Sequence, residues 1–238
     1  MVDFHTHILP GIDDGSPDVR TSVAMLETIY NQGIDRVVAT PHFYAIESDL
    51  DSFLQKRERS IKELIEGSRG GENLPKVAVG AEVLLYPGIA NVEGLERLCI
   101  EGTKYMLTEL PFARWYKGST YDVLARILNR GIVPIIAHID RYIHLQKDKD
   151  VVFRLIDMGC LIQANGGFFE NFRTRHKAFY LLKCEAIHFL GSDCHNMESR
   201  KPDVDLAYNR IEKKLGTDYI DNIEDMADLV LRNAIYRL

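Results

Sequence analysis

Short hydrophobic runs alternate along the chain with longer segments in which apolar residues recur every three or four positions. The runs have the length of β-strands, and several are almost continuously apolar, as in Ile132–Ala137. Such runs are typical of strands buried on both faces of a parallel sheet. We expect seven strands, near Val2–Thr6, Arg36–Thr40, Lys76–Val83, Tyr105–Leu110, Ile132–His138, Cys160–Ala164 and Ala186–Gly191.

The longer segments have the spacing of amphipathic helices. Ser16-Pro17 is typical of a helix start, and the apolar positions that follow continue at helical spacing until Gly33, which favours a helix end. We expect further helices over Leu50–Gly67, Thr120–Asn129, Lys149–Met158, Arg175–Lys183, Asp205–Leu215 and Ile223–Arg237.

This alternation of strands and helices predicts an α/β fold with a parallel sheet. No strong linker, repeat or low-complexity tract divides the chain, so we expect one domain over residues 1–238. The simplest architecture is a single distorted (β/α)7 barrel, a relative of the eight-fold barrel. Functional residues in such barrels lie at the carboxyl ends of the strands.

Composition narrows the class of protein. The 238 residues carry a formal net charge of -6, which argues against non-specific binding of nucleic acid or anionic membranes. Asp3, His5 and His7 interrupt any secretory signal, and no apolar run has the length of a membrane span. The four cysteines form no C-x-x-C pair. We expect a reduced, cytoplasmic protein without membrane insertion.

Nearly every expected strand ends in a histidine, aspartate or glutamate. His5 and His7 are two residues apart, so both side chains face one side of the first strand. Buried together, such groups would repel one another or remain unpaired unless cations neutralised them. Imidazole mixed with carboxylate suits Mn, Fe or Zn, and so many ligands can serve two or three metals. The candidates are His5, His7, Asp14, His42, Glu82, Glu109, His138, Asp193 and His195.

The spaced motifs carry a resemblance to a known family. D-F-H-T-H-I-L-P-G-I-D-D-G, T-P-H, the G-x-E of Gly80–Glu82, A-H-x-x-R-Y and S-D-x-H-N-x-x-x-R-x-P resemble the polymerase-and-histidinol-phosphatase (PHP) superfamily. They are most similar to its bacterial tyrosine-phosphatase branch, which acts with capsule and exopolysaccharide kinases. The matching blocks span residues 3 to about 202. Ile139-Asp140 departs from the Pro-Glu expected there, but neither residue is a candidate ligand.

The resemblance implies a distorted seven-fold barrel that holds three divalent metal ions, Mn foremost with Fe or Zn as alternatives. It assigns the nine candidates above as the ligands. Asp13 is adjacent to Asp14 and chemically equal to it, and the family pattern favours Asp14.

Two arginines are candidates for binding phosphate. Arg141 lies three residues after His138 and Arg200 five after His195, so both should reach the same rim. A guanidinium group presents a planar fork that matches phosphate oxygens, although a surface salt bridge is an alternative role. The resemblance assigns both to phosphate recognition.

We therefore predict a metal-dependent protein-tyrosine phosphatase in which a metal-bridging hydroxide attacks the phosphorus of phosphotyrosine. The implied substrate is a phosphotyrosine-containing protein, the tail of a bacterial tyrosine kinase. A small-molecule phosphomonoesterase such as histidinol phosphatase is the closest alternative. An amidohydrolase would usually need a carbamylated lysine, and a silent metal-stabilised binding domain would be expected to lack some ligands.

Cys194 and Arg200 form a C-x5-R pattern like that of cysteine-dependent tyrosine phosphatases. The intervening residues include no glycine for a phosphate-binding loop, and Glu198 adds negative charge. Strand alternation directs Cys194 away from the side that Asp193 and His195 face. We therefore expect no cysteine nucleophile.

Two further stretches have open roles. Phe112, Trp115 and Tyr116 are candidates for an aromatic wall against a phosphotyrosine ring, with loop packing as the equal alternative. The basic stretch from Arg173 to Lys177 suits either an acidic phosphopeptide or a solvated helix start.

Overall fold

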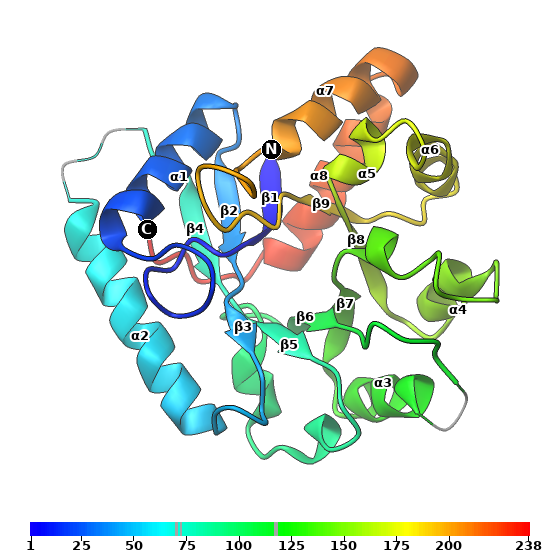
Figure 1. The fold of residues 1–238 in the computed structure, drawn as a ribbon, viewed down its shortest axis with the longest axis horizontal. Coiled ribbons are helices and arrows are strands. Elements are labelled where there is room, and N and C mark those ends of the chain that lie inside the picture. The colour runs from blue at the N-terminus through cyan, green and yellow to red at the C-terminus, as the bar shows by residue number, and fades with distance from the viewer. Residues whose placement is uncertain (70, 72, 117–118) are drawn as a thin grey trace.

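Parallel strands form a strongly curved sheet in the middle of the molecule, and helices cover its outer side (Figure 1). The structure is a computed structural model, and it describes residues 1–69, 71, 73–116 and 119–238. The first sheet has the order β1-β2-β4 and the second β3-β5-β6-β7-β8-β9, and every pairing between neighbours is parallel. The strands are β1 Val2–Thr6, β2 Arg36–Ala39, β3 His42–Phe43, β4 Lys76–Val79, β5 Glu82–Leu84, β6 Tyr105–Glu109, β7 Val133–Ile136, β8 Leu161–Asn165 and β9 Phe189–Gly191.

The helices lie mainly in the connections between these strands. Two short 3₁₀ helices, rather than an α-helix, connect β5 to β6. The α-helices are α1 Val19–Asn31, α2 Leu50–Gly67, α3 Thr120–Asn129, α4 Val151–Asp157, α5 Gly167–Glu170, α6 Arg175–Lys183, α7 Val204–Leu215 and α8 Asp218–Leu231, and the 3₁₀ helices are η1 Ile89–Asn91, η2 Leu95–Leu98 and η3 Ile139–Arg141.

The predicted strand Lys76–Val83 is interrupted at Gly80-Ala81, which separates β4 from β5. A matching interruption at Thr40-Pro41 separates β2 from β3, because proline has no N–H for the ladder. Backbone hydrogen bonds from Gly80 N to Ala39 O (2.8 Å) and from Glu82 N to Pro41 O (2.9 Å) continue the pairing across both interruptions. The interruptions place His42 and Glu82 at the start of a new strand segment, side by side in the β3–β5 register.

The first and last strands also lie side by side. Thr6 and Cys194 form a parallel bridge. His7 N donates to Cys194 O at 2.9 Å, and Asp193 N donates to His5 O at 2.8 Å. The curved sheet therefore brings the segment after β9 against the end of β1. The predicted α/β fold with a parallel sheet is confirmed in this curved form.

Two predicted helix boundaries are wrong. The first helix begins at Val19, and its cap is Asp18, whose side chain accepts from Thr21 N; Ser16 is buried before it. The last helix spans Asp218–Leu231 instead of Ile223–Arg237.

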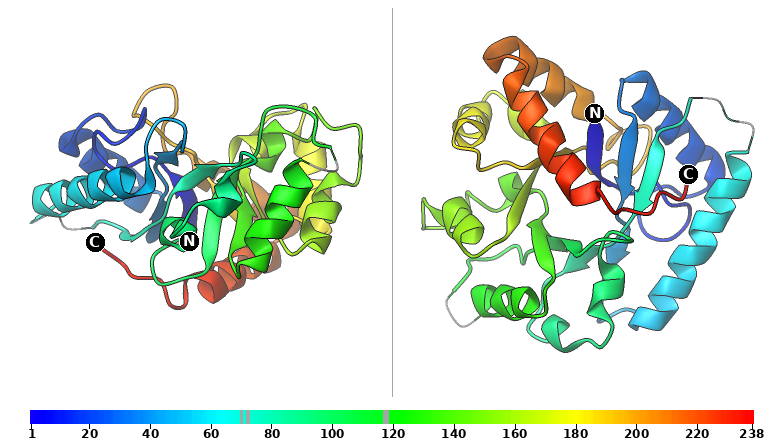
Figure 2. Two further views of the ribbon diagram at one scale, coloured as in Figure 1. Left: turned by 90° about the horizontal axis from the view of Figure 1, so that it is seen from below. Right: turned by 180° about the vertical axis from the view of Figure 1, so that it is seen from behind.

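The chain after α8 pairs antiparallel with β4, as Figure 2 shows for the red C-terminal segment. Arg237 N donates to Val77 O at 2.8 Å, and Val77 N donates to Leu238 O at 3.2 Å. Because β4 is an edge strand, its unpaired backbone groups are satisfied by this tail, which ends the helix early.

A buried apolar cluster fills the space between the strands and α8. Phe4 and Phe189 stack with their ring centroids 4.0 Å apart, and Val230 and Leu231 of α8 belong to the same cluster. Among the described residues, no helix combines the length and the apolar character that crossing a membrane requires.

Candidate metal centre

The curved sheet gathers the candidate ligands at the carboxyl ends of its strands. Three groups of residues each offer ligand atoms that all lie within 4.8 Å of one another. The groups are His7, Asp14, His42 and His195; His5, His7 and Asp193; and His42, Glu82 and Glu109. The ninth candidate, His138, is adjacent to them, with its Nε2 2.8 Å from Glu82 Oε1 and 3.8 Å from Glu109 Oε1. All nine residues chosen from the sequence therefore come together.

The carboxylate of Glu82 is the centre of this cluster. The side chain is buried, and its Oε2 lies 3.2 Å from His5 Nε2 and 3.3 Å from His7 Nε2. The same oxygen lies 3.0 Å from His42 Nδ1, while Oε1 faces His138. A carboxylate that faces imidazoles on several sides is well placed to bridge metal ions.

Two of the candidate ligands have strained backbones. His138 has φ 31° and ψ 57°, and Asp193 has φ 55°. Residues with a side chain rarely adopt this left-handed region, and such strain is concentrated at functional sites. In His138, which follows β7, and Asp193, which follows β9, the left-handed backbone changes the direction of the side chain.

Unpaired nitrogen atoms show that the cluster fits a cation. Among the described residues, the buried atoms His138 Nδ1 and His195 Nε2 have no hydrogen-bond partner, and His42 Nδ1 is 3.0 Å from Glu82 Oε2 without forming a hydrogen bond. His5 Nε2 and His7 Nε2 face each other at 3.1 Å. Buried polar atoms are nearly always paired, so unpaired imidazole nitrogens in a cluster with carboxylates suit transition-metal ions.

Burial and neighbouring charged groups shift the pKa values of several side chains in the cluster. Burial disfavours the charged form of His7, but hydrogen bonds to Asp13 and Glu82 outweigh burial and raise its pKa to about 10. For Asp13, burial is likewise outweighed by the hydrogen bond from His7, which lowers the carboxyl pKa to about 2. Burial, reinforced by charge on His7, lowers the pKa of His195 to about 4. Metal ions bound here would compete with protons for the imidazoles.

Asp13 and Asp14 occupy different surroundings. Asp13 Oδ2 lies 2.7 Å from His7 Nδ1 and accepts from the backbone N–H of His42 at 3.0 Å. A carboxylate on one ring nitrogen fixes the orientation of the imidazole and directs the other nitrogen to a metal. The Asp14 side chain is 66% exposed, and its Oδ1 lies 3.4 Å from His195 Nε2 and 3.6 Å from His42 Nε2.

Sequence reasoning did not identify Gln163, which lies fully buried in β8. Its Oε1 accepts from the backbone N–H of His138 at 2.6 Å and lies 3.3 Å from His5 Nδ1. Its Nε2 donates to Asn165 Oδ1 at 3.1 Å, and Asn165 Nδ2 donates to Asp193 at 3.3 Å. Gln163 thus supports three candidate ligands. A polar residue inside the otherwise apolar run Cys160–Ala164 is the signal that could have found it.

Both predicted arginines reach the rim of the cluster. Arg200 Nη2 donates to Asp193 Oδ1 at 2.8 Å, and Arg141 Nη2 donates to Asp193 Oδ2. Their side chains are 37% and 35% exposed, so each guanidinium has one side on the cluster and another open to solvent. This placement suits the binding of a phosphate that enters from solvent.

Cys194 is fully buried, and its backbone belongs to the β1–β9 contact. Burial raises the pKa of its thiol well above the usual value. A thiol that is neither accessible nor ionised cannot act as the nucleophile. This burial supports the expectation of no cysteine nucleophile, which stays a prediction.

The three aromatic candidates after Glu109 have different positions. Trp115 is buried and packs on Tyr142, with ring centroids 5.4 Å apart. Phe112 is 57% exposed, and its ring lies 6.2 Å from that of His138. Tyr116 is 65% exposed. Trp115 is therefore a packing residue, while Phe112 borders the cluster.

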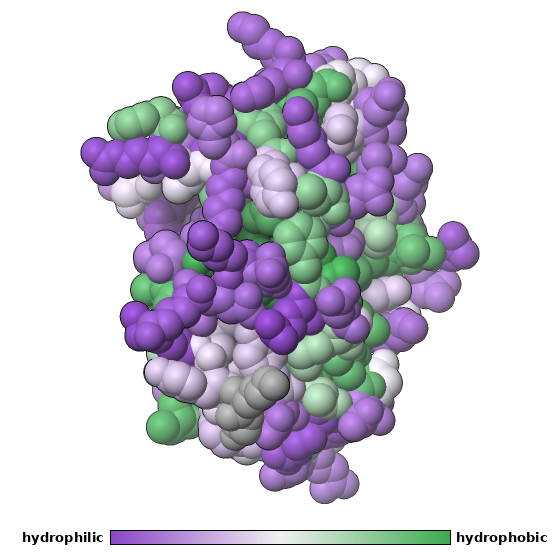
Figure 3. Space-filling model, turned by 90° about the vertical axis from the view of Figure 1, so that its right-hand side faces the viewer, coloured by the Kyte–Doolittle hydropathy of each residue, from purple (hydrophilic) through white to green (hydrophobic). Residues whose placement is uncertain are grey.

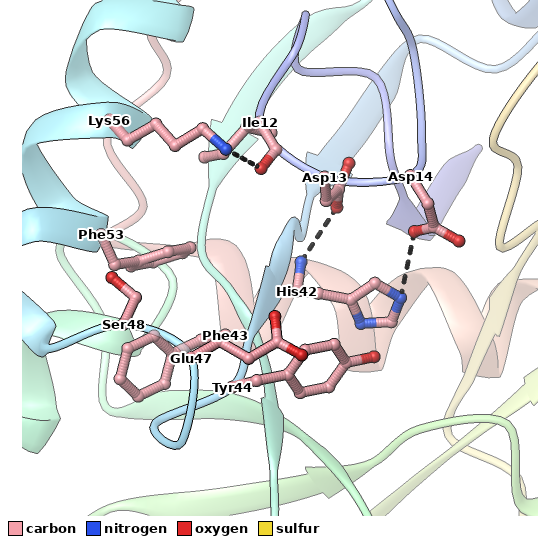
Figure 4. Close-up of a pocket in the computed structure, with 10 residues that line it drawn as sticks. All are labelled: Ile12, Asp13, Asp14, His42, Phe43, Tyr44, Glu47, Ser48, Phe53 and Lys56. Atoms are coloured by element: carbon pink, nitrogen blue, oxygen red, sulfur yellow. Dashed lines mark hydrogen bonds and ion pairs between the residues drawn. The ribbon is translucent and has the colours of Figure 1, made fainter.

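A pocket of about 430 Å³ opens beside Asp14 and His42 (Figure 4). Tyr44, which the sequence did not single out, stacks on the His42 ring with centroids 4.9 Å apart. The far wall is formed by α2, from which Lys56 Nζ donates to Ile12 O at 2.6 Å. The pocket gives the cluster an opening large enough for a ring or side chain.

The sequence and the fold of this chain are similar to those of known proteins. The family model for capsular polysaccharide synthesis, CpsB/CapC, matches residues 1–231. The chain is 34% identical to tyrosine-protein phosphatase CpsB of Streptococcus pneumoniae, with 91% of each chain covered. It is 30% identical to tyrosine-protein phosphatase YwqE of Bacillus subtilis (strain 168), over 98% of this chain and 92% of that protein. A crystal structure from the work on YwqE of B. subtilis and CpsB of S. pneumoniae, described as unique metal-dependent tyrosine phosphatases, superposes with a TM-score of 0.83. Its sequence identity is 26%, with 99% of this chain and 96% of that chain covered.

Proposed function

Because the chain belongs to the CpsB/CapC family of capsular polysaccharide synthesis, we propose that it is a metal-dependent tyrosine-protein phosphatase. The observation that carries the proposal is the convergence of three potential metal-ligand groups, with two arginines on their rim. Metal ions and guanidinium groups at one rim suit the hydrolysis of a phosphate ester.

The proposed cofactors are three divalent transition-metal ions, with Mn foremost. The three ligand groups, which share His7 and His42, support this number. The proposed ligands are His5, His7, Asp14, His42, Glu82, Glu109, His138, Asp193 and His195. When bound, the metals would lower the pKa of a coordinated water and neutralise charge on the phosphoryl oxygens. Asp13 is not a ligand in this proposal, because its carboxylate is already engaged by His7 and by the His42 backbone.

Arg141 and Arg200 bind the phosphoryl group. Each guanidinium donates one hydrogen bond to Asp193. Its remaining N–H groups can donate to the oxygens of a phosphate on the solvent side. In the same proposal, Gln163 fixes the His5 ring and the His138 backbone, which keeps the ligands in place as phosphate binds.

The proposed substrate is phosphotyrosine in a protein, in particular the tail of a bacterial tyrosine kinase. The names of the relatives support a tyrosine-phosphate substrate, and the family's role in capsule synthesis supports the kinase. The family match across most of the chain also supports a single domain. If each interrupted strand is counted once, the strand order supports a distorted seven-unit barrel.

The test compares substrates at one metal loading. Metal-free protein is reloaded with Mn, Fe or Zn, and its metal content is measured by mass spectrometry. We expect three ions per chain and faster hydrolysis of a phosphotyrosyl peptide than of histidinol phosphate. Faster hydrolysis of histidinol phosphate would favour the small-molecule alternative. A fully metallated protein inactive on both substrates would contradict the proposal.

A further inference from the structure

The basic stretch singled out in the sequence becomes one wall of a groove in the folded molecule. Arg175 and His176, at the start of α6, face Arg210, Lys213 and Lys214 of α7 across a pocket of about 650 Å³. The two segments lie more than thirty residues apart in the chain. We define the basic groove by its lining residues, which also include Glu170, Phe179, Leu206 and Asn209.

The charge of this groove is opposite to that of the whole chain. Its carboxylate, Glu170, is already taken up by Arg210, at 2.5 and 2.8 Å. Arg175, Lys213 and Lys214 form no ion pair with any part of the chain that the structure describes. A local excess of positive charge in a chain of net charge -6 attracts an anion of a partner.

The floor of the groove is apolar. Phe179 is buried, and Lys214 Nζ lies 4.2 Å from its ring centroid. Leu206 is 46% exposed in the same groove. An apolar floor with cationic sides suits a polypeptide segment better than a free ion. Figure 3 shows the side of the molecule that faces right in Figure 1, where hydrophilic groups surround an apolar area in the middle of the face.

Both walls of the groove continue chain segments that carry the metal centre. The helix α5 begins just after Asn165, which donates to Asp193, and it packs against both α6 and α7 (Figure 1). The other wall, α7, begins four residues after Arg200. In the segment between α5 and α6, the guanidinium carbon of Arg173 lies 5.3 Å from the ring centroid of the exposed Phe172.

We propose that the basic groove binds an anionic segment of the protein substrate while its phosphotyrosine occupies the metal centre. This inference rests on the proposed function. The shared chemistry of the occupant is a run of negatively charged oxygens, which either carboxylates or further phosphoryl groups of the substrate can supply.

The test uses full-length, metal-loaded enzyme and phosphotyrosyl peptides that differ in their flanks. One peptide has four glutamates, a second has phosphoserines, and a third has four glutamines at the same positions. Each flank is placed before and after the phosphotyrosine in turn. We expect a lower KM for an anionic flank than for the glutamine flank, with the difference reduced at high salt. The glutamate and phosphoserine arms distinguish the two sources of charge.

The decisive variant is Lys213→Glu with Lys214→Glu. We expect KM for the preferred anionic peptide to rise roughly tenfold, with kcat unchanged and p-nitrophenyl phosphate hydrolysed as before. The matched control is Arg59→Glu with Lys62→Glu, which makes the same charge change on exposed positions of α2. If the reversed pair lowers stability, Lys213→Gln with Lys214→Gln should show a smaller rise in KM.

Several outcomes would overturn the inference. Equal KM values for all flanks in the wild type would do so, as would equal effects of the α2 control and the α7 variant. A wild type that hydrolyses no phosphotyrosine would instead contradict the proposed function, so the two failures are distinguishable.

Discussion

Asp13 and Asp14 are identical side chains in adjacent positions, yet only one of them points freely into the metal centre. Asp13 is held by His7 and by the His42 backbone, whereas most of the Asp14 side chain is exposed beside His195. Residue chemistry alone could not separate them, because the difference lies in the partners that the fold brings to each carboxylate. Gln163 shows the same limit, since its partners come from other strands.

Replacing Asp13 tests this division of roles. Asp13→Asn should weaken Mn binding roughly tenfold to a hundredfold, because the His7 ring loses its charged partner. Titration of Mn into metal-free protein, followed by calorimetry, measures the change. Asp49→Asn, which alters an exposed carboxylate at the start of α2, is the control. An unchanged Mn affinity for Asp13→Asn would show that the carboxylate has no positioning role.

Replacing Cys194, in contrast, should leave the activity almost unchanged. Cys194→Ser should keep phosphatase activity within about twofold, because the buried thiol takes no part in the chemistry. Asp193→Asn, which changes the neighbouring proposed ligand, should lose most of it. Steady-state hydrolysis of a phosphotyrosyl peptide compares the two. Loss of all activity in Cys194→Ser, with the fold retained by circular dichroism, would restore the cysteine mechanism.

At the scale of elements, the predicted strands and most helices are found near their predicted positions, because buried hydrophobic runs and helical spacing are local signals. The interruption of the predicted strand Lys76–Val83 and the early end of the last helix occur where another element intervenes. Partner strands continue the ladder past the interruptions at Pro41 and Gly80, and the edge of β4 takes the tail from the predicted end of α8. A local sequence pattern indicates neither the neighbouring strand nor the C-terminal tail as the partner.

The close packing of β9 against β1 can be tested by adding a side-chain carbon at Gly191. A Cβ on Gly191 would lie 2.7 Å from both Gln163 Nε2 and the His5 side chain, which is closer than real contacts allow. Gly191→Ala should therefore cost about 1–3 kcal/mol of unfolding free energy, measured in urea.

Gly167→Ala is the matched control for that substitution. A Cβ on Gly167, which starts α5, meets nothing within 4 Å, so the change should be neutral or slightly stabilising. Equal unfolding free energies for the two variants would show that the β1–β9 contact is looser than the structure indicates.

At the scale of the whole molecule, the candidate metal centre joins the ends of strands from both sheets. Removal of the metals should therefore abolish phosphatase activity and also lower the melting temperature, since bound ions stabilise only the folded state. The buried carboxylates and imidazoles would then face one another uncompensated.

Differential scanning calorimetry with and without EDTA measures this effect, and addition of Mn should restore both properties. EDTA that is already saturated with Mn is the control for non-specific effects of the chelator. A metal-free protein with full activity would refute the metal-dependent mechanism. An unchanged melting temperature would show that the centre does not stabilise the fold.

The sequence by itself determined the candidate ligands, their places at strand ends and the class of fold, because side-chain chemistry and hydrophobic period are properties of short segments. Only the tertiary structure decided that Asp14 rather than Asp13 is free, that Gln163 supports the ligands and that α7 adds Lys213 and Lys214 to the basic stretch. Each of these depends on segments far apart in the chain that the curved sheet brings together. The physical reason is that a side chain's environment is set by its neighbours in space, which a local pattern does not specify.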